Sequence, residues 1–249
     1  MIASLMMYLR PELADANARY WALIRQALAS RGIDAPETLS NDADEFEVWN
    51  APDLVLSQTC GMPYRLWLHD HVTLVGTPDF GVPDCPAGYY NSVFIVRADD
   101  ARRTLPYYET ARFTYNQTFS QSGYAAPYAH TTKQGFWFRN RSQSGGHRAS
   151  ACAIAENRAD IAALDAVSWR LIQQHESFAK TLRVLDTTPP TPGLPYIAAT
   201  TANRADTFAA ISDAIAALTP ADTAALGIRA LIDLPKADYL SIANPPQGA

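Results

Sequence analysis

Three loops of this 249-residue chain combine glycine with small hydrogen-bond donors, the residue types that bind anions through backbone and hydroxyl groups. They are Ser57-Gln58-Thr59-Cys60-Gly61, Ser120-Gln121-Ser122-Gly123 and Ser144-Gly145-Gly146-His147. Each loop follows a strand-like run and precedes a helix-like run. Because a helix N-terminus offers unpaired N–H groups and about half a positive charge, each loop predicts either an ordinary helix cap or a seat for an oxyanion.

Two titratable residues, His147 and Asp165, also lie at the predicted start of a helix. His147 falls in the first turn of a predicted helix, where the dipole disfavours a protonated ring and a bound dianion would reverse that preference. Asp165 ends the run "IAALD", from which it could face a cleft or cap the helix that begins at "AVSWRL". For both residues the purely structural interpretation stays open. The chain contains no Walker loop, nucleophile elbow or metal-ligand spacing, so we expect no catalytic residue, metal or cofactor.

The elements that must position these residues alternate between strands and helices. Strand-like runs are predicted at 2–8, 53–57, 72–78, 92–98, 111–115, 161–165, 181–188 and 196–200, and the C-terminal part is predicted to be helical. This alternation predicts an α/β fold built on mainly parallel sheets flanked by helices. The long strand near 92–98 and a proline-rich return near 187–195 predict two lobes, residues 1–95 with 190–249 and residues 96–189.

The charge and hydropathy of the chain exclude some classes of function. A formal net charge of −5 argues against a general nucleic-acid-binding protein, although a local cleft can still be positive. No apolar run is long enough to span a membrane, and the opening "MIASLMMYLRPE" lacks the basic region of a signal peptide. We therefore expect a monomer that inserts into no membrane, cytoplasmic if the sequence is complete.

Several segments, taken in order, resemble one family. They are "SQTCGMPY", "VGTPDFGVPDCPAGYYNSVFIVRADD", "NQTFSQSGY", "SGGHRASACAIAENRADIAALDAVSW" and "LRVLDTTPPTPGLPYIA". Together they resemble the phosphate-, phosphite- and phosphonate-binding proteins of ABC importers, the PhnD-like branch of the type II periplasmic binding fold. The resemblance covers about residues 1–200. It implies two α/β lobes that close over a ligand about a two-strand hinge, a periplasmic location and an ABC permease as partner.

The resemblance also implies a set of ligand-binding residues. Ser120, Gln121 and Ser122 match the family's phosphonate cradle, which continues through Gly123 and Tyr124. His147 matches a phosphonate-contacting histidine, and Asp165 matches a position that selects the rest of the ligand. The wider set of candidates is Ser144, Gln58, Thr59, Tyr90 and Tyr8. The family usually has threonine at position 121 and Asp-Pro at Gln117-Thr118, and the longer Gln121 could shrink the pocket or donate from its amide.

Cys60 and Cys85 are implied to lie in first-lobe loops near the cleft, where they are candidates for a disulfide. Free thiols are the alternative, since the three cysteines of the chain show no CxxC spacing.

Three functions remain open at this point. The first is a solute-binding protein that captures a phosphate-type oxyanion between its lobes for an importer. The second is a cytoplasmic enzyme on the same fold, of the menaquinone- or thiamine-precursor type, with His147 and Asp165 as an acid/base pair. The third is a ligand sensor that passes its closed state to a partner protein.

Overall fold

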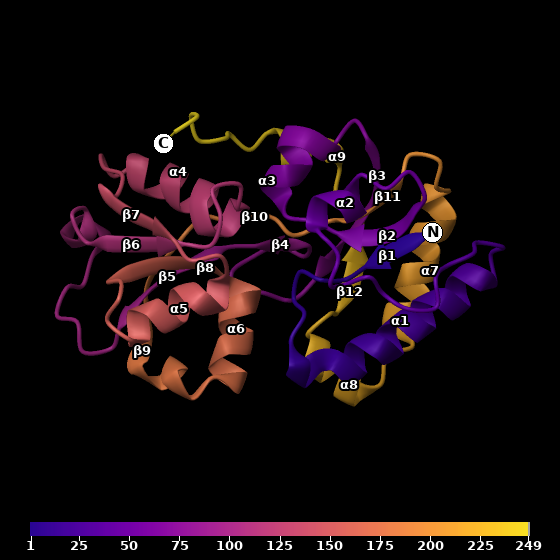
Figure 1. Cartoon of the computed structure of the whole chain (residues 1–249), viewed down its shortest axis with the longest axis horizontal. Coiled ribbons are helices and arrows are strands. Elements are labelled where there is room, and N and C mark those ends of the chain that lie inside the picture. The colour runs from indigo at the N-terminus through magenta and orange to yellow at the C-terminus, as the bar shows by residue number, and fades with distance from the viewer. Residues whose placement is uncertain (249) are drawn as a thin grey trace. The chain divides into compact units, whose positions relative to one another are not determined.

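A computed structural model describes residues 1–248 of the chain, which form two compact units (Figure 1). The first unit contains Met1–Tyr89 and Pro192–Ser241, and the second contains Tyr90–Thr191 and the residues from Ile242 onward. A short two-stranded sheet, β4 (Tyr89–Tyr90) with β10 (Thr191–Pro192), lies where the chain passes from one unit to the other and back. The predicted two-lobed α/β fold is therefore confirmed.

The first unit is built on a five-stranded sheet in the order β1-β2-β11-β3-β12. These strands are Ile2–Ser4, Leu54–Gln58, Tyr196–Ala199, Val72–Asp79 and Ala230–Ile232, respectively. The helical segments of the unit are η1 (Pro11–Leu13), α1 (Ala14–Ala29), α2 (Glu45–Trp49), α3 (Gly61–Pro63), η2 (Tyr64–Leu68), α7 (Arg204–Ala216), α8 (Pro220–Leu226) and α9 (Lys236–Leu240). Helix α1 buries Tyr20, Ile24 and Leu28 at a four-residue spacing, which places one apolar stripe against α7.

The second unit has a sheet in the order β7-β6-β8-β5-β9. These strands are Asn140–Gln143, Arg112–Tyr115, Ile161–Asp165, Ser92–Arg97 and Leu182–Thr187, respectively. Its helical segments are η3 (Leu105–Tyr108), η4 (Gln121–Ala125), α4 (Ala126–Thr132), α5 (His147–Ala155), α6 (Ala166–His175) and η5 (Ser177–Thr181).

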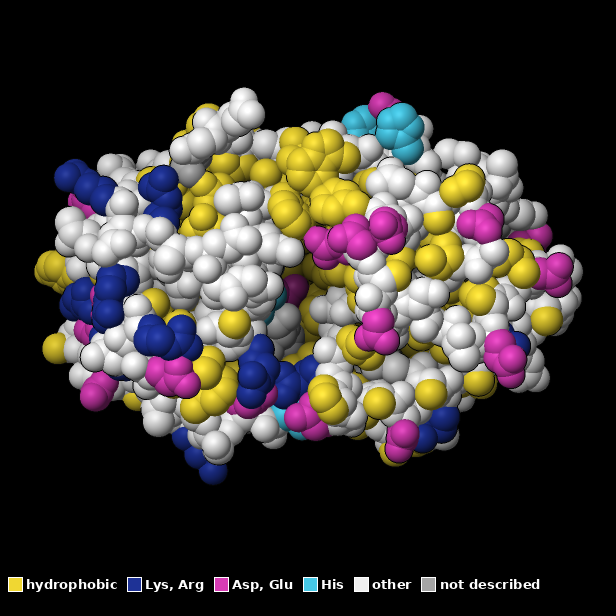
Figure 2. Space-filling view, viewed as in Figure 1, with side chains coloured by type: hydrophobic (Ala, Val, Ile, Leu, Met, Phe, Trp, Pro, Cys, Tyr) yellow, Lys and Arg dark blue, Asp and Glu magenta, His cyan; other side chains and the backbone are white. Residues whose placement is uncertain are grey.

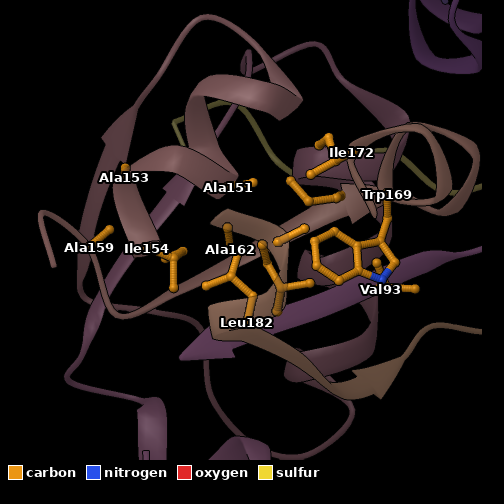
Figure 3. Packing of buried hydrophobic residues seen from close by; sticks show 12 residues of the cluster. Val93, Ala151, Ala153, Ile154, Ala159, Ala162, Trp169, Ile172 and Leu182 are labelled. Atoms are coloured by element: carbon orange, nitrogen blue, oxygen red, sulfur yellow. The ribbon is translucent and has the colours of Figure 1, made fainter. Parts of the chain in front are cut away.

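The two central strands of the second unit are apolar on both faces. Along β8, Ala162 and Leu164 pack into a cluster with Trp169 and Ile172 (Figure 3), whereas Ile161 and Ala163 join a cluster on the other face. Because successive strand residues point to opposite faces, this division shows that side chains cover the sheet on both sides. The uninterrupted apolar run "IAALD" is the sequence signature of that double burial.

The prediction of mainly parallel sheets is wrong. In the first unit only β1 and β2 are parallel, while β11 and β12 run antiparallel to their neighbours. In the second unit β6 is parallel to β7 and β8, but β5 is antiparallel to both β8 and β9. The cause is the connectivity, because β5 leads the chain into the second unit and β9 leads it out, so they run in opposite directions.

Other differences concern boundaries. Residues 92–95, which the predicted division assigned to the first lobe, belong to β5 and pair with β8 and β9 in the second unit. The first strand is only Ile2–Ser4, rather than 2–8. The C-terminal part is not wholly helical, since β12 pairs with β3 at the edge of the sheet.

Charge is divided unevenly between the units. The first unit has 8 Lys and Arg against 17 Asp and Glu, a formal charge of −9, whereas the second has 12 against 8, a formal charge of +4. In Figure 2 Lys and Arg side chains gather on the visible face of the second unit, and Asp and Glu side chains gather on that of the first. The acidic net charge of the chain therefore belongs to the first unit alone.

Candidate ligand-binding site

The cradle loop predicted at Ser120 is the beginning of a helix. Ser120 is the N-cap of η4, and its Oγ accepts a hydrogen bond from the backbone N–H of Gly123 at 3.0 Å. The backbone oxygen of Ser120 accepts from Tyr124 and Ala125 at 3.2 and 3.0 Å. Capping is therefore one role of this loop. The amide of Ser122 stands in the first turn, where backbone N–H groups have no acceptor within the helix, and such amides suit an anion.

The third predicted loop, Ser144-Gly145-Gly146-His147, is attached to the end of β6. The backbone N–H groups of Ser144 and Gly145 donate to the carbonyl oxygens of Tyr115 and Asn116 at 2.8 and 3.0 Å. The Ser144 hydroxyl lies within hydrogen-bond distance of the Gly146 oxygen and of Ser150 Oγ, at 3.0 and 2.7 Å. Since these local contacts use the Ser144 hydroxyl, the structure gives Ser144 a positioning role in the loop.

The two loops meet through the side chains of Ser122 and His147. Ser122 Oγ lies 3.0 Å from His147 Nε2, a hydrogen bond that joins residues 25 positions apart in the sequence. Burial of the imidazole lowers the pKa of His147 to about 4, so the ring is neutral at physiological pH. Its Nδ1 is buried without a hydrogen-bond partner among residues 1–248. A neutral ring with unused capacity, beside a serine hydroxyl and helix N-termini, can donate to an oxyanion.

Asp165 acts as a helix cap in this structure. Its side chain is 2 % exposed, and Oδ1 accepts from the backbone N–H groups of Val167 and Ser168 at 2.6 and 3.0 Å. The strand that ends at Asp165, β8, contacts η4, so the residue lies in the same part of the unit as the cradle. The cap interpretation of Asp165 is confirmed, and a role toward a ligand stays a prediction.

The capping role of Asp165 predicts a graded loss of stability. We expect Asp165→Ala to lower the free energy of unfolding by about 1–2 kcal/mol, because α6 loses its N-cap acceptor. Asp165→Asn keeps an oxygen in place and should cost less than half as much. Urea unfolding followed by circular dichroism measures both, with the exposed Asp99→Ala as the matched control. Equal losses for Asn and Ala would contradict the capping role.

Three other predicted ligand residues, Gln121, Tyr124 and Tyr90, are largely buried. Gln121 is 1 % exposed, so its longer side chain is accommodated inside the second unit. Tyr124 is 6 % exposed and packs edge-on against Tyr115 and Trp137. Tyr90, which the predicted division places in the first lobe, is 3 % exposed and lies in the second unit.

The first unit has a small cavity lined by two of the predicted residues, Tyr8 and Gln58. Its volume is about 30 Å³, and Tyr20, Phe80 and Tyr196 also line it. The hydroxyls of Tyr20 and Tyr196 lie 3.3 Å apart, and burial raises the pKa of both, that of Tyr196 to about 12, so both stay protonated. Gln58 Nε2 donates to the carbonyl oxygen of Leu194 at 3.1 Å.

Thr59 is fully buried, and its backbone N–H donates to Pro195 at 3.1 Å. The structure does not place Thr59 among the residues that line this cavity.

The three cysteines form no disulfide among the described residues, so the suggested Cys60–Cys85 bridge is absent there. Partial burial beside Asp84 raises the pKa of the Cys85 thiol to about 11. Because the thiolate is the species that attacks in disulfide formation, this environment disfavours oxidation of Cys85.

Sequence reasoning missed Asn116, Tyr20 and Tyr196. Asn116 directly follows β6, and its side chain fills the space beside Gly123. The position of Asn116 at a strand's carboxyl end was a signal that could have indicated a site residue. The sequence around the two tyrosines, by contrast, predicts only core residues of α1 and β11. Within residues 1–248 there is no cluster of acidic, histidine and cysteine side chains able to hold a metal ion, and no helix is long and apolar enough to span a bilayer.

Comparison of the fold with solved structures identifies the class of protein. The structure of PhnD1 from Prochlorococcus marinus, in complex with methylphosphonate, superposes with a TM-score of 0.70 at 14% identity over 96% of this chain and 94% of that one. A binding protein component of an ABC phosphonate transporter from Pseudomonas aeruginosa gives 0.69 at 15% identity, over 96% and 82%. A third structure, XAC2383 from Xanthomonas citri bound to ATP, gives 0.67 at 14% identity, over 95% and 91%. The fold is thus that of the type II periplasmic binding proteins.

The family follows from the sequence. Residues 70–239 match the family model described as ABC transporter, phosphonate, periplasmic substrate-binding protein. The chain belongs to this family of phosphonate ABC-transporter substrate-binding proteins. No curated protein matches the chain significantly by sequence. Because the family binds and delivers solutes, the solute-binding prediction is confirmed and the enzyme alternative is not favoured.

Proposed function

We propose that this chain binds a small tetrahedral phosphorus oxyanion, such as methylphosphonate, phosphite or phosphate, through the second unit. The observation that carries the proposal is the meeting of Ser122 and His147 at 3.0 Å, from two loops that each begin a helix. With the Ser122 hydroxyl donating to Nε2, the ring offers its Nδ1–H to the ligand beside the first-turn amides, and these donors add no formal charge. Such donors can bind an oxyanion and release it again, as a transport protein requires.

The charge of the second unit supports an anionic ligand. A formal charge of +4 attracts anions, whereas the chain as a whole, at −5, would repel them. PhnD1, whose fold this chain shares, was solved with methylphosphonate, which makes that anion the first ligand to test. Tyr8, Gln58, Thr59, Tyr90 and Asp165 stay predicted ligand residues, each testable by substitution. We further propose that the protein is monomeric and delivers its ligand to an ABC permease.

A thermal-shift titration tests the proposal. At a ligand concentration about 100 times Kd, mass action adds about 2.7 kcal/mol to the stability, which corresponds to a rise in Tm of about 5–10 °C. We expect this rise with at least one of methylphosphonate, phosphite and phosphate. Sodium acetate at equal ionic strength is the control, because it is an anion without tetrahedral geometry. An unchanged Tm with all three phosphorus anions would overturn the proposal.

A further inference from the structure

Two strands carry the chain between the units, and their first-unit ends lie against each other. They are β4 and β10, and Gly88 and Gly193 adjoin them on the side of the first unit. The backbone N–H of Gly193 donates to the carbonyl oxygen of Gly88 at 2.8 Å. A Cβ at position 193 would lie 2.9 Å from that oxygen, closer than Cβ atoms come, so glycine permits this approach.

Helix α9 contacts both of these strands through two consecutive residues. The Tyr89 hydroxyl donates to Asp238 Oδ2 at 2.8 Å, and the Tyr239 hydroxyl donates to the carbonyl oxygen of Gly193 at 3.0 Å. Tyr239 also hydrogen-bonds to Thr77 Oγ1, on strand β3. We call Asp238 and Tyr239 the hinge anchor, because they join the outgoing strand, the returning strand and the main sheet of the first unit.

The environment of Tyr239 makes the hinge anchor rigid. Its side chain is 1 % exposed, and its ring packs edge-on against Tyr64 with the ring centroids 5.1 Å apart. Burial raises the pKa of Tyr239 well above its usual range, so the hydroxyl keeps the proton that it donates. Breaking the bond to Gly193 would leave a buried polar group short of a partner, a state that folded proteins rarely contain.

The same two strands are joined again where they enter the second unit. The backbone N–H of Thr188 donates to the Ser92 carbonyl oxygen at 2.9 Å, and that of Ser92 donates to Thr188 Oγ1 at 3.0 Å. Only residues 89–91 and 189–192 lie between the two joined points. Three of the four residues 189–192 are prolines, whose φ is fixed, so the returning strand has few free backbone dihedral angles.

We propose that the hinge anchor keeps the first-unit ends of both crossing strands fixed, and that bending between the units is confined to residues 90–91 and 189–191. This inference rests on the proposed function in one respect, since periplasmic binding proteins move their lobes when a ligand binds. Tyr89 and Tyr239 are then positioning residues, because they act on the strands rather than on the ligand. A short bending segment also limits the backbone entropy that ligand binding must remove.

Hydrogen exchange of single amides, measured by NMR on the ligand-free protein, tests the anchor. Tyr239→Phe keeps the buried ring and removes only the hydroxyl. We expect the Gly193 amide to exchange about tenfold faster in this variant, because local opening no longer breaks the hydrogen bond from Tyr239. The amides of Ser92 and Leu56, outside the anchor, should keep their rates within about threefold. Equal acceleration at all three amides would indicate a general loss of stability and overturn the anchor.

Tyr64→Phe is the matched control. Tyr64 is as deeply buried as Tyr239 and contacts its ring, but its hydroxyl has no hydrogen-bond partner among residues 1–248. Removal of this hydroxyl should therefore leave exchange of the Gly193 amide within about twofold of the wild type. An effect of Tyr64→Phe as large as that of Tyr239→Phe would show that packing, and not the hydrogen bond, holds the strand.

The same measurement with saturating methylphosphonate tests where the chain bends. We expect the ligand to change the exchange rates of the amides of residues 90, 91 and 191 by at least threefold in the wild type. Those of Gly88 and Gly193 should stay unchanged, because the anchor holds them in both states. In Tyr239→Phe the ligand-dependent change should extend to Gly193, an effect that a purely local packing role would not produce.

The outcomes separate this inference from the proposed function. Equal exchange of the Gly193 amide in wild type and Tyr239→Phe overturns the anchor, whether or not any anion binds. Wild-type protein that binds none of methylphosphonate, phosphite and phosphate overturns the proposed function, and the ligand-free comparison then decides the anchor alone. Ligand-dependent changes at Gly88 and Gly193 in the wild type overturn the assignment of the bending residues.

Discussion

His147→Ala is expected to weaken binding of methylphosphonate about 100-fold, the largest effect we expect on affinity. The substitution removes the imidazole that hydrogen-bonds to Ser122 at 3.0 Å and the unused Nδ1 beside it. A hydrogen bond to a charged group contributes about 1.5–3 kcal/mol, and loss of the ring also leaves the Ser122 hydroxyl without its orienting partner. Titration calorimetry at pH 7 measures the change in Kd.

Two further variants make the His147 result specific. His147→Gln keeps a neutral side chain with N–H donors, so we expect it to lose only about tenfold in affinity. His175→Ala removes an exposed histidine from the end of α6 in the same unit and should bind as the wild type does. A His147→Ala variant that binds within about threefold of the wild type would show that the ring does not contact the ligand.

The elements that position the site could be predicted from the sequence, but the sheet arrangement could not. Runs such as "IAALD" and "AVSWRLIQQH" carry their burial pattern locally, and β8 and α6 lie where that pattern places them. The direction of β5 against its neighbours depends on how the chain enters and leaves the second unit, a property of the whole chain. The alternation of strands and helices therefore predicts a mainly parallel sheet, and the observed strand pairing shows that this prediction is wrong.

The candidate site, too, could be predicted from the sequence only in part. Ser120 and Asp165 could be recognised from their types and positions, yet the same residue types serve as caps and as ligands, so the sequence left both roles open. The approach of Ser122 to His147 and the space that Gly123 leaves for Asn116 are tertiary contacts. No local pattern encodes them. Likewise, the pKa of the Cys85 thiol is raised mainly by partial burial, which the sequence does not reveal, although the neighbouring Asp84 is visible in it.

The lowered pKa of His147 predicts how the stability of the protein depends on pH. Burial lowers the pKa of His147 to about 4 in the folded protein, against about 6.5 in an unfolded chain. Since the unfolded state then binds the proton first, the free energy of unfolding should be unaffected by His147 above pH 6.5 and fall as the pH drops toward 4. The full shift corresponds to about 3 kcal/mol, and we expect about 2 because the residue is only partly shielded from solvent.

Two carboxylates titrate at lower pH than His147, so the contribution of His147 to the pH dependence of stability can be measured separately. A hydrogen bond from Arg102 lowers the pKa of Asp100 to about 2, and one from Arg112 holds that of Asp160 well below its usual value. Their stabilisation is lost mainly below pH 4. Urea unfolding of wild type and His147→Gln at pH 7 and 4.5 should therefore show a steeper loss in the wild type. Saturating methylphosphonate should reduce that difference, because a bound anion favours the protonated ring and raises its pKa. Parallel pH profiles for the two proteins would show that His147 is not held neutral by the fold.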